Sequence, residues 1–200
     1  MNLLDNKKLQ TGLSQLNLIV SAEKQSQLIT YLHLLQKWNK AYNLTAITHF
    51  DKMISYHLLD SLSVAPHLVG NHIVDVGSGA GLPGIPLAIF YPEKQFTLID
   101  SIGKKTRFIT QAARELQLPN VQVVNCRAEE YPTKHSFDTM IARAVASVDD
   151  LVRISTELLR VDGTLMMMKS NASQEKITLP HRIIELTVPG IDAHRSLIII

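Results

Sequence analysis

Apolar residues in the first third of the chain recur at the three- and four-residue steps of an α-helix. A first such stretch runs from Ser21, a suitable N-cap, to Tyr42. A second begins near Asp51 and ends before Pro66. The positions that share the inner faces of these two stretches are Leu28, Tyr31, Leu32, Leu35, Trp38, Ile54, His57, Leu58, Ser61 and Leu62. We therefore predict a helical extension over residues 1–70.

Short β-rich runs alternate with helical segments after His72. The predicted strands span 73–76, 95–99, 121–124, 137–141, 164–168, 183–188 and 196–200, and the predicted helices span 104–116 and 148–159. Because parallel neighbours need crossover connections, this alternation favours a mostly parallel seven-stranded sheet with helices on both faces. The last two strands are expected to close it as an antiparallel pair. We predict an α/β, Rossmann-like domain over residues 71–200 with its ligand at the carboxyl ends of the strands.

Three glycines follow the first predicted strand at alternate positions. Gly77, Gly79 and Gly81 come just after Asp75. A glycine has no Cβ, so the chain can turn sharply there and a ligand can lie against bare backbone. Asp75 is expected at the strand end, near the amino group of the ligand or an ordered water. This pattern is typical of the S-adenosyl-L-methionine (SAM) loop of class I methyltransferases.

A dinucleotide fingerprint overlaps the same loop. Residues 79–84 read G-x-G-x-x-G, and Asp100 lies at about the right distance to hold a ribose. Pro83, however, has no N–H to offer a pyrophosphate, and SAM carries no phosphate. The loop therefore favours a methyltransferase over a nicotinamide-dependent oxidoreductase.

The ends of the later strands supply further candidate binding residues. Asp100 can accept both ribose hydroxyls, although a surface aspartate capping the next helix would look the same. Ala128 and Glu129 stand where adenine lies in this fold class. Arg127 and Arg143 also stand at strand ends and are expected to face the pocket as positioning residues. Arg143 can position the cofactor or a guanine O6, although a structural ion pair is the alternative.

The basic and aromatic residues offer weaker signals. Three basic residues, Lys104, Lys105 and Arg107, open the helix after Asp100 and can hold RNA phosphates or simply form a solvated helix face. Tyr31, Trp38 and Tyr42 can stack on bases, whereas at helical spacing such residues more often pack. The remaining candidate, His57, is expected to hydrogen-bond Asp60 three residues later rather than to catalyse. No acid/base dyad is predicted.

Composition limits the broader possibilities. Twenty basic against eighteen acidic residues leave a net charge of +2, which permits but does not demand an acidic partner such as RNA. The single cysteine, Cys126, excludes a multi-cysteine zinc site and is expected to be a small buried side chain. Because the sequence shows neither a signal peptide nor a long apolar run, we expect a cytoplasmic protein without membrane contact. No dimerisation seam is visible, so a monomer is expected.

Nearly the whole chain resembles one family, the bacterial 16S ribosomal RNA small-subunit methyltransferase G, also called glucose-inhibited division protein B. The resemblance rests on residues 38–47, 57–62, 75–89, 100–105 and 143–146, and most specifically on GSGAGLPGIP from Gly77 to Pro86. Two departures are Lys169-Ser170 after the fifth strand and a C-terminus without a basic tail.

The resemblance implies transfer of a methyl group from SAM to N7 of a guanine, position 527 in the usual numbering, in the 530 loop of 16S rRNA within the 30S subunit or an assembly intermediate. It further implies a set of cofactor-binding residues, namely Gly77, Leu82, Ala128, Glu129 and Arg143. Two alternatives remain open: a small-molecule SAM methyltransferase, which needs no RNA, and a non-catalytic SAM- or nucleotide-binding protein, which transfers nothing.

Overall fold

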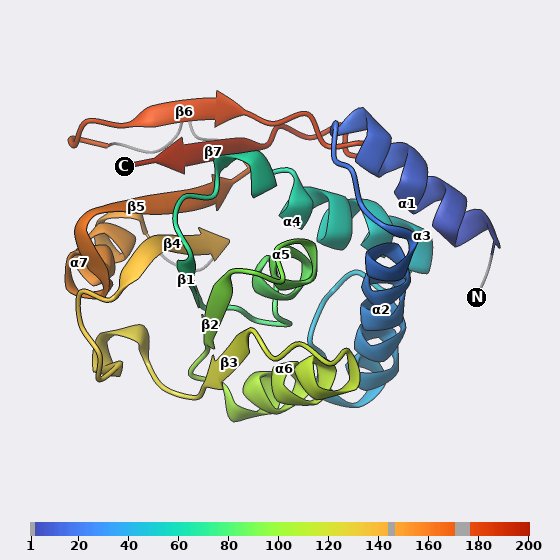
Figure 1. The fold of residues 1–200 in the computed structure, drawn as a ribbon, viewed down its shortest axis with the longest axis horizontal. Helices are drawn as coiled ribbons and strands as arrows, with labels where there is room; N and C mark the ends of the chain where they lie inside the picture. Colours follow the sequence, from blue (N-terminus) through green and yellow to red (C-terminus); the bar gives the residue numbers. More distant parts are fainter. Residues whose placement is uncertain (1–2, 144–146, 171–176) are drawn as a thin grey trace.

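A single seven-stranded sheet organises the molecule, as the computed structural model shows (Figure 1). The structure describes residues 3–143, 147–170 and 177–200, so residues 144–146 of the family resemblance lie outside it. The strand order is β3-β2-β1-β4-β5-β7-β6. The strands are β1 (His72–Val76), β2 (Gln95–Ile99), β3 (Val121–Val124), β4 (Phe137–Arg143), β5 (Leu159–Lys169), β6 (Arg182–Glu185) and β7 (Ser196–Ile199).

The pairing confirms the predicted topology. Strands β1 to β5 are parallel, whereas β7 is antiparallel to both β5 and β6. The order of connections reverses at β1, beside β4, which is where doubly wound sheets bind ligands. β5 is longer than its prediction because helix α7 runs into it directly at Leu159.

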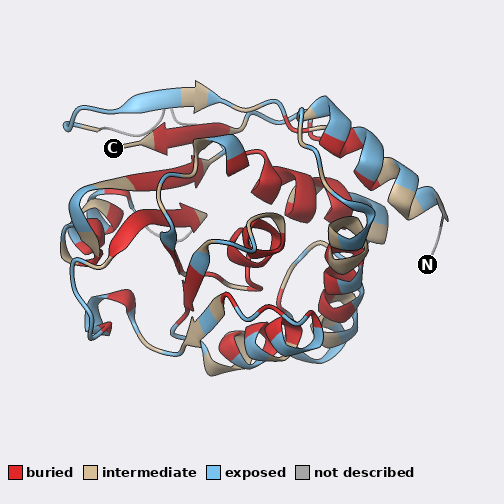
Figure 2. Cartoon of the chain, in the orientation of Figure 1, coloured by how far each residue is buried: buried red, intermediate tan, exposed pale blue. Residues whose placement is uncertain are grey.

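Helices cover both faces of the sheet (Figures 1 and 2). The helical elements are α1 (Leu3–Gln15), α2 (Ala22–Tyr42), α3 (Phe50–Met53), the π-helix η1 (Ile54–Leu59), α4 (Asp60–Leu62), the 3₁₀-helix η2 (Ala65–His67), α5 (Gly84–Phe90), α6 (Gly103–Glu115), the 3₁₀-helix η3 (Ala128–Glu130) and α7 (Val148–Leu158). Ser21 caps α2 as predicted, because its side chain accepts from the Lys24 N–H.

Two hydrophobic cores follow from the alternation of side chains along each strand. In β4, Met140 and Ala142 enter the core under α7, whereas Ile141 between them enters the larger core on the opposite face. That larger core also takes in residues of α1, α2 and η1. The helical extension is therefore continuous with the packing of the sheet domain, and a boundary near residue 70 stays a prediction.

Helix α2 also reaches the glycine loop directly. The hydroxyl of Tyr31, which is fully buried, donates to the Ala80 carbonyl oxygen at 2.6 Å. Trp38 packs between Tyr42 and Phe108, with ring centroids 5.2 and 5.7 Å away. Tyr31 and Trp38 are therefore packing residues, and only Tyr42 of this predicted set has an exposed ring.

The middle of the second helical stretch is a π-helix, which the apolar spacing does not predict. The predicted bond between His57 and Asp60 is wrong. His57 Nε2 lies 3.0 Å from Thr45 Oγ1, while the Asp60 carboxylate accepts from two arginines. Two guanidinium groups bind a carboxylate more strongly than a neutral imidazole does.

None of the described helices is long and apolar enough to cross a bilayer.

Replacing Tyr31 by Phe should destabilise the protein by about 1–2 kcal/mol, because the buried Ala80 carbonyl loses its donor. Urea unfolding followed by circular dichroism measures the change. Tyr42→Phe, which removes a hydroxyl from a partly exposed ring, should leave stability nearly unchanged. Equal effects from both variants would show that the Tyr31 hydrogen bond does not anchor the loop.

Candidate functional site

The loop after β1 is built from glycines in a left-handed conformation. Gly77, Gly79 and Gly81 have φ of 68°, 61° and 84°, which L-residues with a Cβ rarely adopt. The Ile99 carbonyl oxygen at the end of β2 accepts from the N–H groups of Gly77 and Ser78 at 2.8 and 3.0 Å. The loop is thus tied to the neighbouring strand through its backbone, and its three glycines carry no side chain that would keep a ligand away from that backbone.

Asp100 holds the other side of this loop. Its carboxylate, 5% exposed, accepts from the Gly79 N–H at 2.9 Å and from the Ile102 N–H at 2.8 Å. Lys105 Nζ lies 3.6 Å from the same carboxylate. A carboxylate can accept about four hydrogen bonds, so Asp100 keeps acceptor capacity for a ligand.

A cavity of about 500 Å³ opens between this loop and the ends of β2, β3 and β4. This volume falls within the range of cofactor sites. Of the predicted site residues, it is lined by Gly77, Gly79, Asp100, Ala128, Glu129, Arg127 and Arg143. Residues from four separate segments therefore meet at the switch point of the sheet.

A smaller cavity of about 130 Å³ continues past the glycines toward the helical extension. Leu82 lines it together with Gly77, Gly79, Arg143 and His57. Leu82 is thus brought close to the rest of the predicted set, although it does not line the larger cavity.

Three predicted residues line neither cavity. Asp75 is 1% exposed and lies beneath the loop, where its carboxylate accepts from the Gly84 N–H at 2.9 Å. Burial raises the pKa of Asp75 to about 7. The backbone of Gly81 faces Ile85. Lys104 is also outside, because consecutive residues of a helix point about 100° apart and Lys105 takes the inward position.

The structure also brings to the site several residues that the sequence did not predict to bind the cofactor. Lys105, one of the three basic residues at the start of α6, lines the larger cavity together with Ile154, which no motif distinguishes. Cys126 also lines it and is only half-buried rather than buried as predicted; burial raises the pKa of its thiol. Asp60 was visible as a carboxylate within an apolar helical run, which is a signal that a buried charge needs a partner.

Arg143 forms the ion pair that was one of its two predicted alternatives, and its contact with a ligand stays a prediction. Its Nη1 donates to Asp60 Oδ2 at 3.0 Å and to the Tyr56 carbonyl oxygen at 3.1 Å. Its guanidinium also lines the cavities on both sides. The ion pair fixes the Arg143 side chain at the border between these two cavities, where it can contact a ligand bound in either of them.

His57 lines the smaller cavity as an uncharged side chain at neutral pH. It is 4% exposed, and burial, assisted by the positive charge of Arg143, lowers its pKa to about 4. A neutral imidazole adds no positive charge beside a cationic ligand.

The family model of rRNA small subunit methyltransferase G matches residues 24–188. Two curated relatives carry the name Ribosomal RNA small subunit methyltransferase G. The protein of Methylobacillus flagellatus is 46% identical over 196 residues, covering 96% of both chains. That of Hydrogenovibrio crunogenus is 49% identical over 179 residues, covering 86% of this chain and 83% of its own.

The chain belongs to the rRNA small subunit methyltransferase G family. Solved structures show the same fold at low identity. A SAM-dependent methyltransferase from Aquifex aeolicus superposes with a TM-score of 0.55 at 14% identity, over 71% of this chain and 89% of its own. A tRNA methyltransferase from the same organism gives 0.56 at 14% identity, over 70% and 67%. The Rossmann-like methyltransferase fold predicted from the sequence is confirmed.

Replacing Gly79 by Val should weaken SAM binding by about 100-fold or more while the fold persists. A β-branched residue is strained at a φ of 61°, and its side chain would occupy the cavity. Calorimetric titration with SAM measures the affinity, and thermal unfolding checks the fold. Gly103→Ala is the control, because its new Cβ would meet only Asn125 Oδ1, at 3.4 Å. Unchanged affinity in Gly79→Val would place the cofactor elsewhere.

Stability should fall by about 2–3 kcal/mol between pH 7 and pH 4.5 through His57. Its folded pKa is about 4, below the ordinary value of 6.5, so the unfolded chain takes up the proton first as the pH falls. Urea unfolding at both pH values measures this contribution. His57→Gln should reduce the pH dependence, whereas the same change at the exposed His49 should not. Identical slopes in wild type and His57→Gln would contradict the prediction.

Proposed function

We propose that this chain transfers a methyl group from SAM to N7 of a guanine in the 530 loop of 16S rRNA. The observation that carries the proposal is the cavity of about 500 Å³, here called the cofactor cavity, in which Gly77, Gly79, Asp100 and Arg143 meet. It occurs in a member of an rRNA methyltransferase family. The substrate is the small ribosomal subunit or an assembly intermediate, the enzyme acts as a monomer, and its location is cytoplasmic because that is where bacterial ribosomes lie.

The residues present fit SAM. Asp100 is placed to accept the ribose hydroxyls, and the small side chain of Ala128 leaves room for adenine beside Glu129. The methionine part would extend past Gly77 toward Leu82. When bound, SAM supplies an electrophilic methyl group on a positively charged sulfur. No phosphate-binding groups are needed at Pro83.

The chemistry asks the protein for orientation more than for proton transfer. Guanine N7 has an in-plane lone pair at neutral pH, so no proton must be removed before attack. Holding reacting groups in line at near-attack distance can supply several kcal/mol of the barrier reduction. Arg143 is rigidly held by Asp60 and the Tyr56 backbone and borders the cofactor cavity, which suits it to this task. His57 stays neutral and so does not repel the sulfonium.

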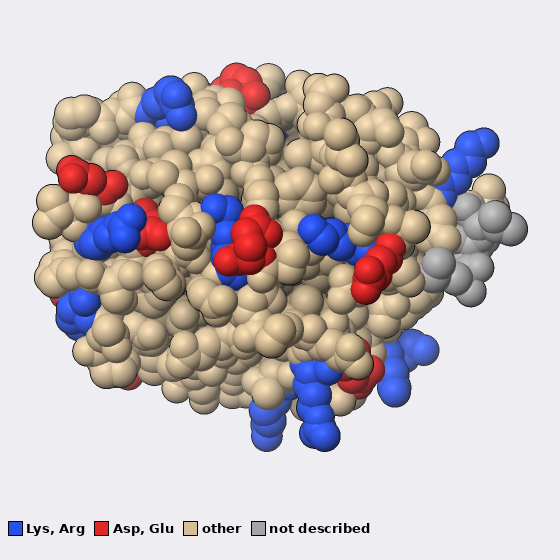
Figure 3. Space-filling model, in the orientation of Figure 1, with Lys and Arg blue, Asp and Glu red and all other residues tan. Residues whose placement is uncertain are grey.

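The charge distribution suits a substrate of defined shape. On the face shown in Figure 3, basic side chains are separated by acidic and uncharged ones rather than gathered into a continuous patch. With a net charge of +2, phosphate attraction alone supplies little affinity. A folded RNA within a particle offers more contacts than a flexible strand does.

The proposal is tested by incubating the protein with labelled SAM and, separately, with small subunits lacking this modification, naked 16S rRNA, or no RNA. Nuclease digestion and mass spectrometry then locate the label. We expect N7-methylguanosine at one position of 16S rRNA, with Gly79→Val giving none.

Each other outcome of this experiment contradicts the proposal in a distinct way. Transfer in the RNA-free sample would indicate a small-molecule methyltransferase. SAM binding without transfer to any sample would indicate a non-catalytic binding protein. Label on another rRNA atom would retain the enzyme class but refute the N7 assignment.

A further inference from the structure

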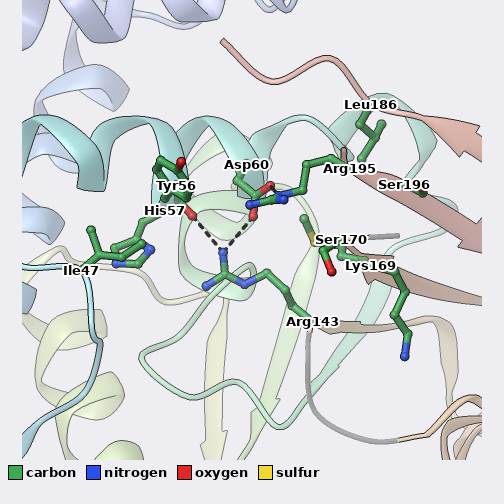
Figure 4. Close-up of a pocket in the computed structure, with 11 residues that line it drawn as sticks. Ile47, Tyr56, His57, Asp60, Arg143, Lys169, Ser170, Leu186, Arg195 and Ser196 are labelled. Carbon is green, nitrogen blue, oxygen red and sulfur yellow. Dashed lines mark hydrogen bonds and ion pairs between the residues drawn. The ribbon is translucent and has the colours of Figure 1, made fainter. Parts of the chain in front are cut away.

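A second cavity, of about 380 Å³, shares Arg143 with the cofactor cavity and so adjoins it. Figure 4 shows the residues that line this second cavity. It lies where β4 and β5 end, between η1 and the start of β7. We call it the acceptor cavity. It is lined by Ile47, Tyr56, His57, Asp60, Arg143, Met168, Lys169, Ser170, Leu186, Arg195 and Ser196. Any ligand in it lies next to whatever the cofactor cavity holds.

Its walls combine apolar surfaces with one charged edge. Ile47, Met168 and Leu186 supply the apolar surfaces. At the edge, Asp60 accepts from Arg143 Nη1 and from Arg195 Nε, each at 3.0 Å (Figure 4). A flat aromatic ring with polar atoms on its rim matches this combination better than a charged or purely apolar ligand does.

Arg143 has donors to spare at this edge. Its two hydrogen bonds to described residues both use Nη1. A guanidinium carries five N–H groups, so Nε and Nη2 remain to contact a ligand as far as the described part of the chain goes. Guanine O6 accepts such a bond, whereas the amino group of adenine at the same position would face a donor with a donor.

We propose that the acceptor cavity holds the methyl-accepting guanine, unstacked from its RNA, with Arg143 donating to O6. Asp60 acts as the positioning residue that fixes the Arg143 guanidinium. Because N7 neighbours O6 on the same edge of the base, a guanine bound in this way directs N7 toward the cofactor cavity. Unstacking costs a few kcal/mol, which contacts with the apolar walls offset. This inference rests on the proposed function.

The first test fills the acceptor cavity without touching the cofactor cavity. Ser170 is exposed and lines the acceptor cavity but neither of the other two cavities described above. Ser170→Trp should therefore keep the guanine base out of the acceptor cavity. We expect SAM affinity within about twofold of wild type and a single-turnover transfer rate to small subunits reduced by about 100-fold. Ser14→Trp, the same change at an exposed serine on α1, should leave both unchanged.

Two results would overturn the assignment. Transfer by Ser170→Trp at the wild-type rate would show that the base binds elsewhere. A loss of SAM affinity as large as the loss of rate would show that the cavity holds the cofactor. Failure of the proposed function is distinguishable, because it appears in wild type as the absence of N7-methylguanosine.

The second test separates positioning from stability. Asp60→Asn keeps the shape of the side chain but removes the charge that holds Arg143. Asp138→Asn is the matched control: Asp138 is equally buried, at 4% exposure, and pairs with Arg160 at the other end of the sheet. Asp60→Asn should slow transfer at saturating SAM and RNA by about tenfold or more. Asp138→Asn should lower the unfolding temperature without slowing transfer. Equal rates in Asp60→Asn and wild type, or equal slowing in both variants, would refute the positioning role.

Discussion

The Asp60 carboxylate, held between the guanidiniums of Arg143 and Arg195, is the interaction on which the arrangement of this site depends. It joins the helical extension, the end of β4 and the start of β7. Asp60 is 4% exposed, and a buried charge is tolerated only when it is paired and hydrogen-bonded. These ion pairs fix the helical extension, which carries Asp60, against the carboxyl ends of the central strands. They thereby also fix the residues of the extension that line the acceptor cavity and the smaller cavity beside Leu82.

A second buried carboxylate orders the cofactor side by a related principle. Asp100 satisfies backbone N–H groups of the glycine loop and of the segment leading into α6. Ser78 and Ala80 are buried, but the three glycines of the loop have no side chains to pack. The shape of the loop therefore also depends on hydrogen bonds at each end and on the Tyr31 hydroxyl under its middle. A loop held in this way is preorganised, so little conformational entropy remains to be lost when a ligand binds.

Arg143 connects the two halves of the site. It borders the cofactor cavity, the smaller cavity beside Leu82 and the acceptor cavity. A residue shared in this way can couple the orientation of one ligand to that of the other. The proposed reaction needs alignment rather than proton transfer, and for such a reaction a shared and rigid contact can supply much of what the protein contributes.

The sequence by itself determined the features that depend on neighbouring residues. The spacing of apolar positions predicted the strands and most helices, because helical and extended backbones have different periods. The alternate glycines after Asp75 predicted the loop, and the residues around Gly77 to Pro86 indicated the family. Asp100, Ala128 and Arg143 could be placed at the same edge because parallel strands end together.

Only the tertiary structure decided which polar groups meet. The partners of Asp60 proved to be Arg143 and Arg195, 83 and 135 residues away, rather than His57, three residues before it. The π-helix over Ile54–Leu59 changed the directions in which the side chains around His57 point. The start of α6 at Gly103 directed Lys105 rather than Lys104 toward the cofactor cavity. A hydrophobic period repeats over many residues and can therefore be recognised in the sequence. A single long-range charge pair has no repeat, and its partner is chosen by the packing that brings distant segments together.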